Sequence, residues 1–232
     1  IFSYYMLATT VATVIMSLVS PIHTALFPRL SQLVVKKDET GISDLYHRGC
    51  QLASIIILPI SITMIFFSKE ILSTWIGDPT VVNNTHILLS LLIVGTTIKA
   101  YMTLPYTLQL AHGWTKLAFY RNVIAVIIII PSMLWAAQMY QGMGAAWVLI
   151  ILYLGLLIFE IIIMHKRILK GNMRKRYGYD VFIPVLIVSI IGLAAHEIHD
   201  IFPIEVSEVI TVLVVLCTLL FSFMASAWST GN

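Results

Sequence analysis

Long apolar runs, separated by short polar segments, follow one another along the whole chain. A helix that crosses the hydrocarbon core of a bilayer needs roughly 20 such residues. Seven stretches qualify: 4–34, 49–68, 85–111, 117–138, 143–165, 181–196 and 206–228. We expect Pro21 and Pro28 to interrupt the first. Runs such as 122–136 do not alternate between apolar and polar positions, so they do not fit the strands of a membrane barrel. The pattern predicts an all-α, polytopic membrane helical bundle.

Composition supports a membrane protein and adds an expected orientation. Of the 232 residues, 59% are hydrophobic and 11% are charged, whereas about a quarter are charged in soluble domains. The net charge of +3 is not a nucleic-acid footprint, because the basic residues concentrate in alternate loops. The positive-inside rule then predicts that the loops at 35–48, 112–117 and 166–180 are cytoplasmic.

The first residue is Ile1, and no signal-peptide pattern precedes the first apolar run. We expect this chain to lack an N-terminal part of its protein. A site built between two halves of the molecule would then show only one of its walls here.

Polar residues inside two of the predicted spans repeat at helical spacing. In the third span, the intervals are three, four and three, and the residues are Thr96, Lys99, Thr103 and Tyr106. In the first span, a hydroxyl stripe repeats at three, four, three and four: Thr10, Thr13, Ser17, Ser20 and Thr24. Residues at these spacings share one helix face. Hydroxyls often only join helices in membranes or bond to their own backbone, so packing remains an alternative for the second stripe.

Lys99 lies near the middle of its span, with roughly 20 Å of helix on either side. A lysine at the bilayer centre costs about 2.5–3.5 kcal/mol on insertion scales, and its side chain is too short to reach either interface. We therefore expect Lys99 to face a water-filled cavity, an anionic ligand or a carboxylate. Glu160 is the carboxylate inside a span, so a structural Lys99–Glu160 ion pair is the alternative to a cavity.

The other ionisable residues suggest no chemistry. We expect Arg121 to extend toward the cytoplasmic headgroups and Glu160 to reach Lys166 or Arg167 along its own helix. No His, Cys or carboxylate spacing fits a metal site, and no nucleophile with a base is recognisable. The sequence predicts no cofactor, no metal and no enzymatic activity.

Several segments resemble one family of transporters. They are "SPIHTALFPRLSQL" (20–33), "LPYTLQLAHGWTKLAFYRN" (104–122), "GMGAAW" (142–147) and "MHKRIL" (164–169). All four are similar to segments of bacterial oligosaccharide flippases, of the multidrug/oligosaccharidyl-lipid/polysaccharide exporter superfamily. These proteins move undecaprenyl-pyrophosphate-linked repeat units, such as those of O-antigen and lipopolysaccharide, across the inner membrane.

The resemblance implies an organisation for the chain. Residues 1–178 would form the second lobe of a two-lobe exporter, with five spans, and 179–232 would add two C-terminal transmembrane helices. The N-terminal lobe would be absent from this chain. The expected location is the bacterial inner membrane, and the expected partners are membrane lipids and other polysaccharide-assembly proteins, with no nucleic acid.

The family and the polar residues together suggest a substrate site. Lys99 would bind the anionic pyrophosphate headgroup of the lipid-linked oligosaccharide, together with hydroxyls of Thr96, Thr103 and Tyr106, and Arg121 is a further candidate for the cavity. The facing wall would offer sugar hydrogen bonds from Thr10, Thr13 and Ser17. Rocking of the lobes would expose the cavity to each side in turn.

Two other functions compete with this hypothesis. A multidrug/cation antiporter of the same superfamily would handle cationic substrates, which the cation Lys99 disfavours. A membrane-embedded polysaccharide polymerase or ligase would need chemistry in an outer loop, and "HEIHD" (196–200) is the sole candidate.

Overall fold

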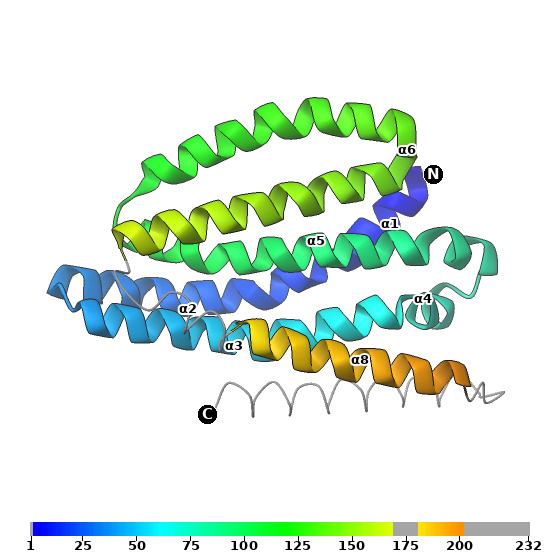
Figure 1. Cartoon of the computed structure of the whole chain (residues 1–232), viewed down its shortest axis with the longest axis horizontal. Coiled ribbons are helices and arrows are strands. Elements are labelled where there is room, and N and C mark those ends of the chain that lie inside the picture. Colours follow the sequence, from blue (N-terminus) through cyan, green and yellow to red (C-terminus); the bar gives the residue numbers. More distant parts are fainter. Residues whose placement is uncertain (1, 169–180, 202–232) are drawn as a thin grey trace.

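The computed structural model describes residues 2–168 and 181–201, and every regular element in these ranges is a helix. The helices are α1 (Phe2–Ala12), α2 (Val14–Lys36), α3 (Glu39–Phe66), α4 (Ser68–Ile76), α5 (Pro79–Ala111), α6 (Thr115–Arg167) and α8 (Ile183–Ile201). They run back and forth along one long axis (Figure 1). The predicted all-α membrane bundle is confirmed.

Helix α5 lies at the centre of the bundle and packs against α1, α2, α3, α4 and α6. Its leucine, isoleucine and alanine side chains supply much of the core: Leu89, Ile93, Ala100 and Leu108 are fully buried. Helix α8 packs against α3, where a Cβ on Gly192 would approach the Phe66 ring to 2.7 Å.

Helix α6 is two antiparallel legs rather than one rod (Figure 1). The chain reverses at Gln141, whose backbone is non-helical (φ 54°, ψ −138°). A Cβ on Gly144 would lie 2.4 Å from the carbonyl oxygen of Ala136, so only glycine allows this close approach of the backbones. The predicted spans 117–138 and 143–165 correspond to the two legs, and Gly144 forms the tight packing point between them, whereas Gly142 faces Leu88 of α5 and Tyr5 of α1.

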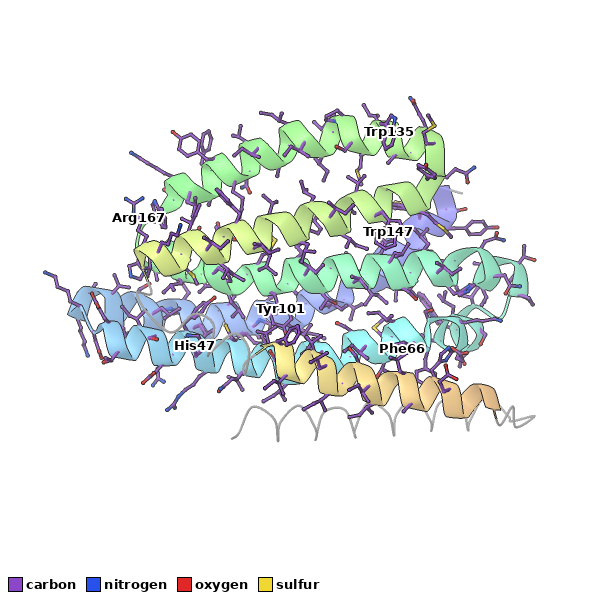
Figure 2. The ribbon with its side chains drawn as sticks, viewed as in Figure 1. His47, Phe66, Tyr101, Trp135, Trp147 and Arg167 are labelled. Atoms are coloured by element: carbon purple, nitrogen blue, oxygen red, sulfur yellow. The ribbon has the colours of Figure 1, made fainter. Side chains whose placement is uncertain are left out.

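The connections lie at the two ends of the bundle in alternation. The α2–α3 turn, the α5–α6 connection and the end of α6 share one end, whereas the α4–α5 turn and the bend of α6 lie at the other (Figure 1). Arg167 marks the first end, and Trp135 and Trp147 lie toward the second (Figure 2). The described parts of the three basic segments, which for the third are Lys166 and Arg167, thus lie at one end, as the positive-inside rule expects of one side of the membrane.

The helix boundaries at two turns follow from local sequence. Asp78 accepts a hydrogen bond from the Thr80 amide at 2.8 Å and caps α5, with Pro79 at its first position. Asp38 caps α3 in the same way, accepting from the Gly41 amide at 2.9 Å. The sequence predicts a short separate helix from Asp38 to Cys50 within the connection at 35–48. In the structure this helix is the first part of α3, so only Lys37 and Asp38 lie outside α2 and α3. Tyr46 and His47 in this first part of α3 are buried, so α3 packs against the bundle there as well.

The other predicted loops are also shorter. Only 112–114 separates α5 from α6, and α6 continues to Arg167, while 169–180 lies outside the described residues. Within the described residues, four helices, with α1 and α2 taken as one and α6 taken as one, are long and apolar enough to cross a membrane: Ser3–Lys36, Glu39–Phe66, Pro79–Ala111 and Thr115–Met164. The sixth predicted span corresponds to α8, whose apolar part is the shorter Ile183–Ala194. The seventh, 206–228, lies outside the described residues.

The first span is interrupted at a different place from the one expected. Pro21 and Pro28 lie inside α2, and the break between α1 and α2 is at Thr13. Membrane helices tolerate proline because nearby polar groups can satisfy the freed carbonyls. A proline cannot donate a hydrogen bond to the carbonyl four residues earlier. Pro21 therefore leaves the carbonyl of Ser17 free, and Pro28 leaves that of Thr24 free.

Candidate functional site

A cavity of about 200 Å³ lies between the central helix α5 and both legs of α6. Its polar lining consists of Lys99, Thr103 and Tyr106 from α5 with Arg121, Asn122 and Tyr153 from α6. Met16 of α2 closes one edge. The spacing of four and three puts the α5 residues on one face, and the reversal at Gln141 brings both legs of α6 to it. The sequence predicted four of these residues as site residues: Lys99, Thr103, Tyr106 and Arg121.

The side chain of Lys99 is exposed, although the residue lies well inside α5. Its Nζ lies 5.7 Å from the centre of the Tyr153 ring, within the range of a cation–π contact. Among residues 2–168 and 181–201, no carboxylate forms an ion pair with it. The expected alternative, a Lys99–Glu160 ion pair, is therefore wrong. The ammonium group has room in the cavity and its charge is not neutralised by the described part of the chain.

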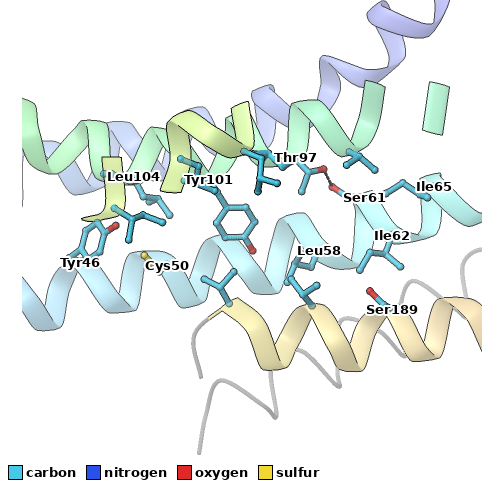
Figure 3. A pocket seen from close by; sticks show the side chains of 18 residues that line it. Tyr46, Cys50, Leu58, Ser61, Ile62, Ile65, Thr97, Tyr101, Leu104 and Ser189 are labelled. Carbon is cyan, nitrogen blue, oxygen red and sulfur yellow. Dashed lines mark hydrogen bonds between the residues drawn. The ribbon is translucent and has the colours of Figure 1, made fainter. Parts of the chain in front are cut away.

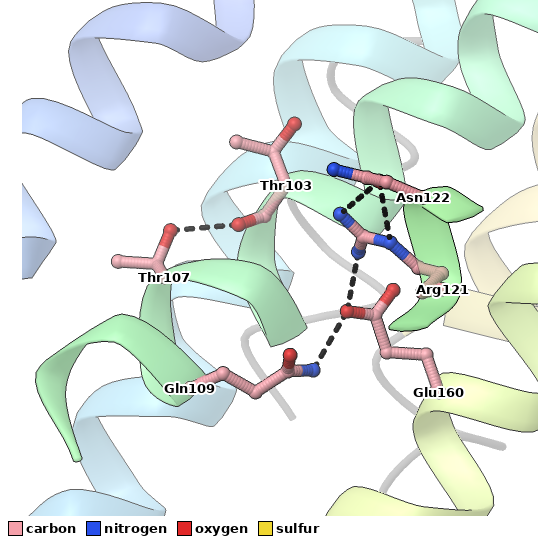
Figure 4. A network of polar contacts seen from close by, with 6 residues as sticks. All are labelled: Thr103, Thr107, Gln109, Arg121, Asn122 and Glu160. Atoms are coloured by element: carbon pink, nitrogen blue, oxygen red, sulfur yellow. Dashed lines mark hydrogen bonds and ion pairs between the residues drawn. The ribbon is translucent and has the colours of Figure 1, made fainter. Parts of the chain in front are cut away.

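Beside the cavity, Gln109, Glu160 and Arg121 form a hydrogen-bonded network (Figure 4). Oε1 of Glu160 accepts from Nη1 of Arg121 at 2.7 Å and from Nε2 of Gln109 at 2.6 Å. Glu160 is 1% exposed and Arg121 13%. The guanidinium of Arg121 also lies 5.3 Å from the Tyr106 ring centre. A buried carboxylate needs such partners, so Glu160 and Arg121 stabilise one another.

This network corrects two predictions. Arg121 does not extend to the headgroups, because Glu160 binds it inside the bundle. Glu160 does not reach along its own helix to Lys166 or Arg167; Arg167 instead stacks on Trp114, with Cζ 4.4 Å from the ring centre. A signal for the pair was present in the sequence, since a carboxylate and a cation inside neighbouring spans both need a partner.

The remaining predicted site residues do not line the cavity. Thr96 is half-buried and its hydroxyl donates to the backbone carbonyls of Leu92 and Ile93 at 2.9 and 3.0 Å. Thr10 and Thr13 also bond to their own helix, at 2.9 and 2.8 Å. All five members of the hydroxyl stripe are nevertheless exposed. The stripe therefore forms an outward polar face on α1 and α2 and does not join helices within the described bundle.

Cysteine labelling tests whether this exposed face meets water or lipid. In a chain with both native cysteines replaced, we expect cysteines at Thr13, Ser17 and Thr103 to react with a membrane-impermeant maleimide. A cysteine at Ile127, which is 65% exposed in an apolar stretch of α6, is the control and should not react, because thiols in hydrocarbon do not ionise. Unreactive thiols at all three polar positions would show that both the hydroxyl stripe and the cavity wall at Thr103 lie in lipid or in packing.

A second cavity, of about 420 Å³, lies between α3, α5, the second leg of α6 and α8. Its lining is apolar apart from hydroxyl and thiol groups. Thr97 and Ser61 form a hydrogen bond of 2.9 Å at its wall (Figure 3), and the hydroxyl of Tyr101, also in the lining, donates to Ser54 at 2.9 Å. The sequence analysis did not find it. No charged side chain lines it, so it suits an apolar chain and not an anion.

Comparison with known proteins agrees with this architecture. The family model MatE matches residues 3–135, which is more than half of the chain. No curated protein and no solved structure matches. The match covers α1 to α5 and most of the first leg of α6. It therefore includes the hydroxyl stripe of α1 and α2 and the face of α5 that carries Lys99, Thr103 and Tyr106. The chain belongs to the MatE family and is a multi-pass membrane transporter of the multidrug/oligosaccharidyl-lipid/polysaccharide exporter superfamily.

Proposed function

We propose that this transporter translocates lipid-linked oligosaccharides whose headgroup is a pyrophosphate, by alternating access across the bacterial inner membrane. The observation that carries the proposal is Lys99, an exposed ammonium group inside a membrane helix with no ion-pair partner in the described chain. Such a cation is costly in a bilayer. An anionic ligand in the adjoining cavity would offset that cost.

The charge around the cavity favours an anion over a cation. Lys99 and Arg121 line it, and the acidic side chain beside it, Glu160, is buried and bound to Arg121. A cationic drug would therefore meet a net positive site. A pyrophosphate diester carries two negative charges and would be attracted strongly, because Coulomb forces are weakly screened in a low-dielectric site.

The neighbouring hydroxyls and carbonyls extend the proposed site. Thr103 and Tyr106 could donate to phosphate oxygens from the face of α5 that carries Lys99. On α1 and α2, the exposed hydroxyls of Thr10, Thr13 and Ser17, with the carbonyls freed by Pro21 and Pro28, suit sugar hydroxyls. Thr96 is the weakest member of the set, since it is half-buried as well as bonded to its own helix.

The wider context remains part of the proposal. Residues 1–178 would be the second lobe of a two-lobe exporter, and the substrate would bind between this lobe and a first lobe. The basic connections at one end of the bundle would be cytoplasmic. Surface-polysaccharide assembly, as for O-antigen, would be the process served, with other assembly proteins as partners.

A two-substrate assay tests the proposal. Proteoliposomes that contain the full transporter receive either a fluorescent prenyl-pyrophosphate oligosaccharide or a cationic dye. We expect protein-dependent movement of the first to the opposite leaflet, measured by quenching with a membrane-impermeant reagent, and no uptake of the second. Dye uptake without movement of the oligosaccharide would favour the multidrug/cation antiporter and overturn the proposal.

A further inference from the structure

Arg121 has more hydrogen-bond donors than its close partners use. Nη1 donates to Glu160 at 2.7 Å, whereas Nε and Nη2 each lie 3.4 Å from Oδ1 of Asn122. Hydrogen bonds between N–H groups and oxygen usually measure 2.7–3.2 Å. One side of the guanidinium is therefore bound tightly, and the edge formed by Nε and Nη2 is only loosely occupied (Figure 4).

The loosely occupied edge belongs to the cavity. Arg121 and Asn122 both line it, together with Lys99. Glu160 and the ring of Tyr106 hold the other parts of the guanidinium, and Gln109 in turn donates a hydrogen bond to Glu160. Because the guanidinium is planar and rigid, these contacts fix the direction in which the Nε–Nη2 edge points. Glu160 and Gln109 therefore act as positioning residues for that edge.

We propose that Oδ1 of Asn122 occupies the place of a phosphate oxygen, and that the anion displaces Asn122 and binds the Nε–Nη2 edge of Arg121 through two oxygens. The inference rests on the proposed function and deepens it. A phosphate offers one oxygen to each N–H group of this edge, whereas the amide shares a single oxygen between them. Asn122 is exposed, so its amide can turn to water when displaced.

The exchange leaves the buried ion pair intact. An anion that competed with Glu160 for Nη1 would leave a buried carboxylate without a partner, which is strongly unfavourable. Binding at the other edge avoids this penalty. It also makes Arg121 the second cation of the cavity beside Lys99, so that each phosphate of a pyrophosphate has its own cation. A monophosphate would satisfy only one of them.

Asn122→Asp is the sharpest test. A carboxylate at this position would pair with the Nε–Nη2 edge and block it. We expect the affinity of the purified full-length protein for inorganic pyrophosphate, measured by calorimetry, to fall at least about tenfold, as for the loss of one charged hydrogen-bonded pair. Gln138→Glu adds the same charge at an exposed position of the same leg and should change the affinity less than about twofold. Asn122→Ala removes the amide without adding charge and should bind at least as well as the original protein.

Each other outcome has a defined meaning. Normal affinity in Asn122→Asp, or a tenfold loss in Asn122→Ala, would overturn the inference. So would a lower thermal midpoint of Asn122→Asp, because the new ion pair should not destabilise the fold. Lys99→Ala separates the two proposals: pyrophosphate binding that does not depend on Lys99 contradicts the proposed function itself. Dependence on Lys99 with no effect of Asn122→Asp contradicts only the role of Asn122.

Discussion

Lys99→Ala is expected to abolish export of surface polysaccharide, whereas Lys99→Arg keeps part of it. Alanine removes the mobile cation of the cavity, and a charge-assisted hydrogen bond contributes roughly 1.5–3 kcal/mol, or about tenfold or more in affinity. Arginine keeps the charge with a different shape, so it restores the attraction without the original geometry. The measurement is complementation of a strain that lacks its own transporter, at equal protein levels in the membrane.

Two controls make the Lys99 experiment decisive. Lys69→Ala removes the same charge from an exposed position on α4, outside the cavity, and should leave export unchanged. Lys99→Leu replaces the cation by a residue that lipid and protein both accept, so its protein should be at least as stable as the original. Normal export by Lys99→Leu would rule out the binding role, and misfolding could not explain such a result.

Breaking the Arg121–Glu160 pair is expected to have the largest effect on stability. Arg121→Leu leaves Glu160, which is 1% exposed, without its cation, and Glu160→Leu leaves the guanidinium without its anion. Each single substitution should lower the free energy of unfolding by about 3–5 kcal/mol, the cost of an unpaired buried charge. Unfolding of the purified protein in mixed detergent micelles, followed by circular dichroism, gives this quantity.

The double variant Arg121→Leu/Glu160→Leu separates stability from function. With both charges gone, most of the lost stability should return, except for about 1–3 kcal/mol because Gln109 loses its acceptor. The double variant should still fail to bind pyrophosphate, since the guanidinium is absent. Additive losses in the double variant would mean that the two side chains do not stabilise one another.

The membrane class and most helix boundaries could be predicted from local sequence. Apolar runs long enough to cross a bilayer predict helices, since backbone groups in lipid must bond within the segment. Asp78 and Pro79 mark the start of α5 because capping depends on neighbours in the chain. The start of α3 agrees with a helix predicted to begin at Asp38, but its continuity with the following span was missed, because the burial of Tyr46 depends on packing against other helices.

The composition of the site could be predicted only in part. The spacing of Lys99, Thr103 and Tyr106 places them on one helix face whatever the rest of the chain does. The hydroxyls of Thr10 and Thr13 fit the same rule, yet periodicity does not reveal whether such a face meets water, lipid or protein. Asn122 and Gln109 drew no functional prediction, because each acquires its role from residues far away in the chain.

The sequence by itself therefore determined the membrane class, the helical segments and the mid-membrane lysine, because hydropathy, capping and helix periodicity act over a few neighbouring residues. Only the tertiary structure decided that Glu160 pairs with Arg121, 39 positions earlier, and leaves Lys99 facing a cavity. That choice depends on the reversal at Gln141, which brings two legs of α6 against α5. Ion pairs form between whichever buried charges the packing brings within reach.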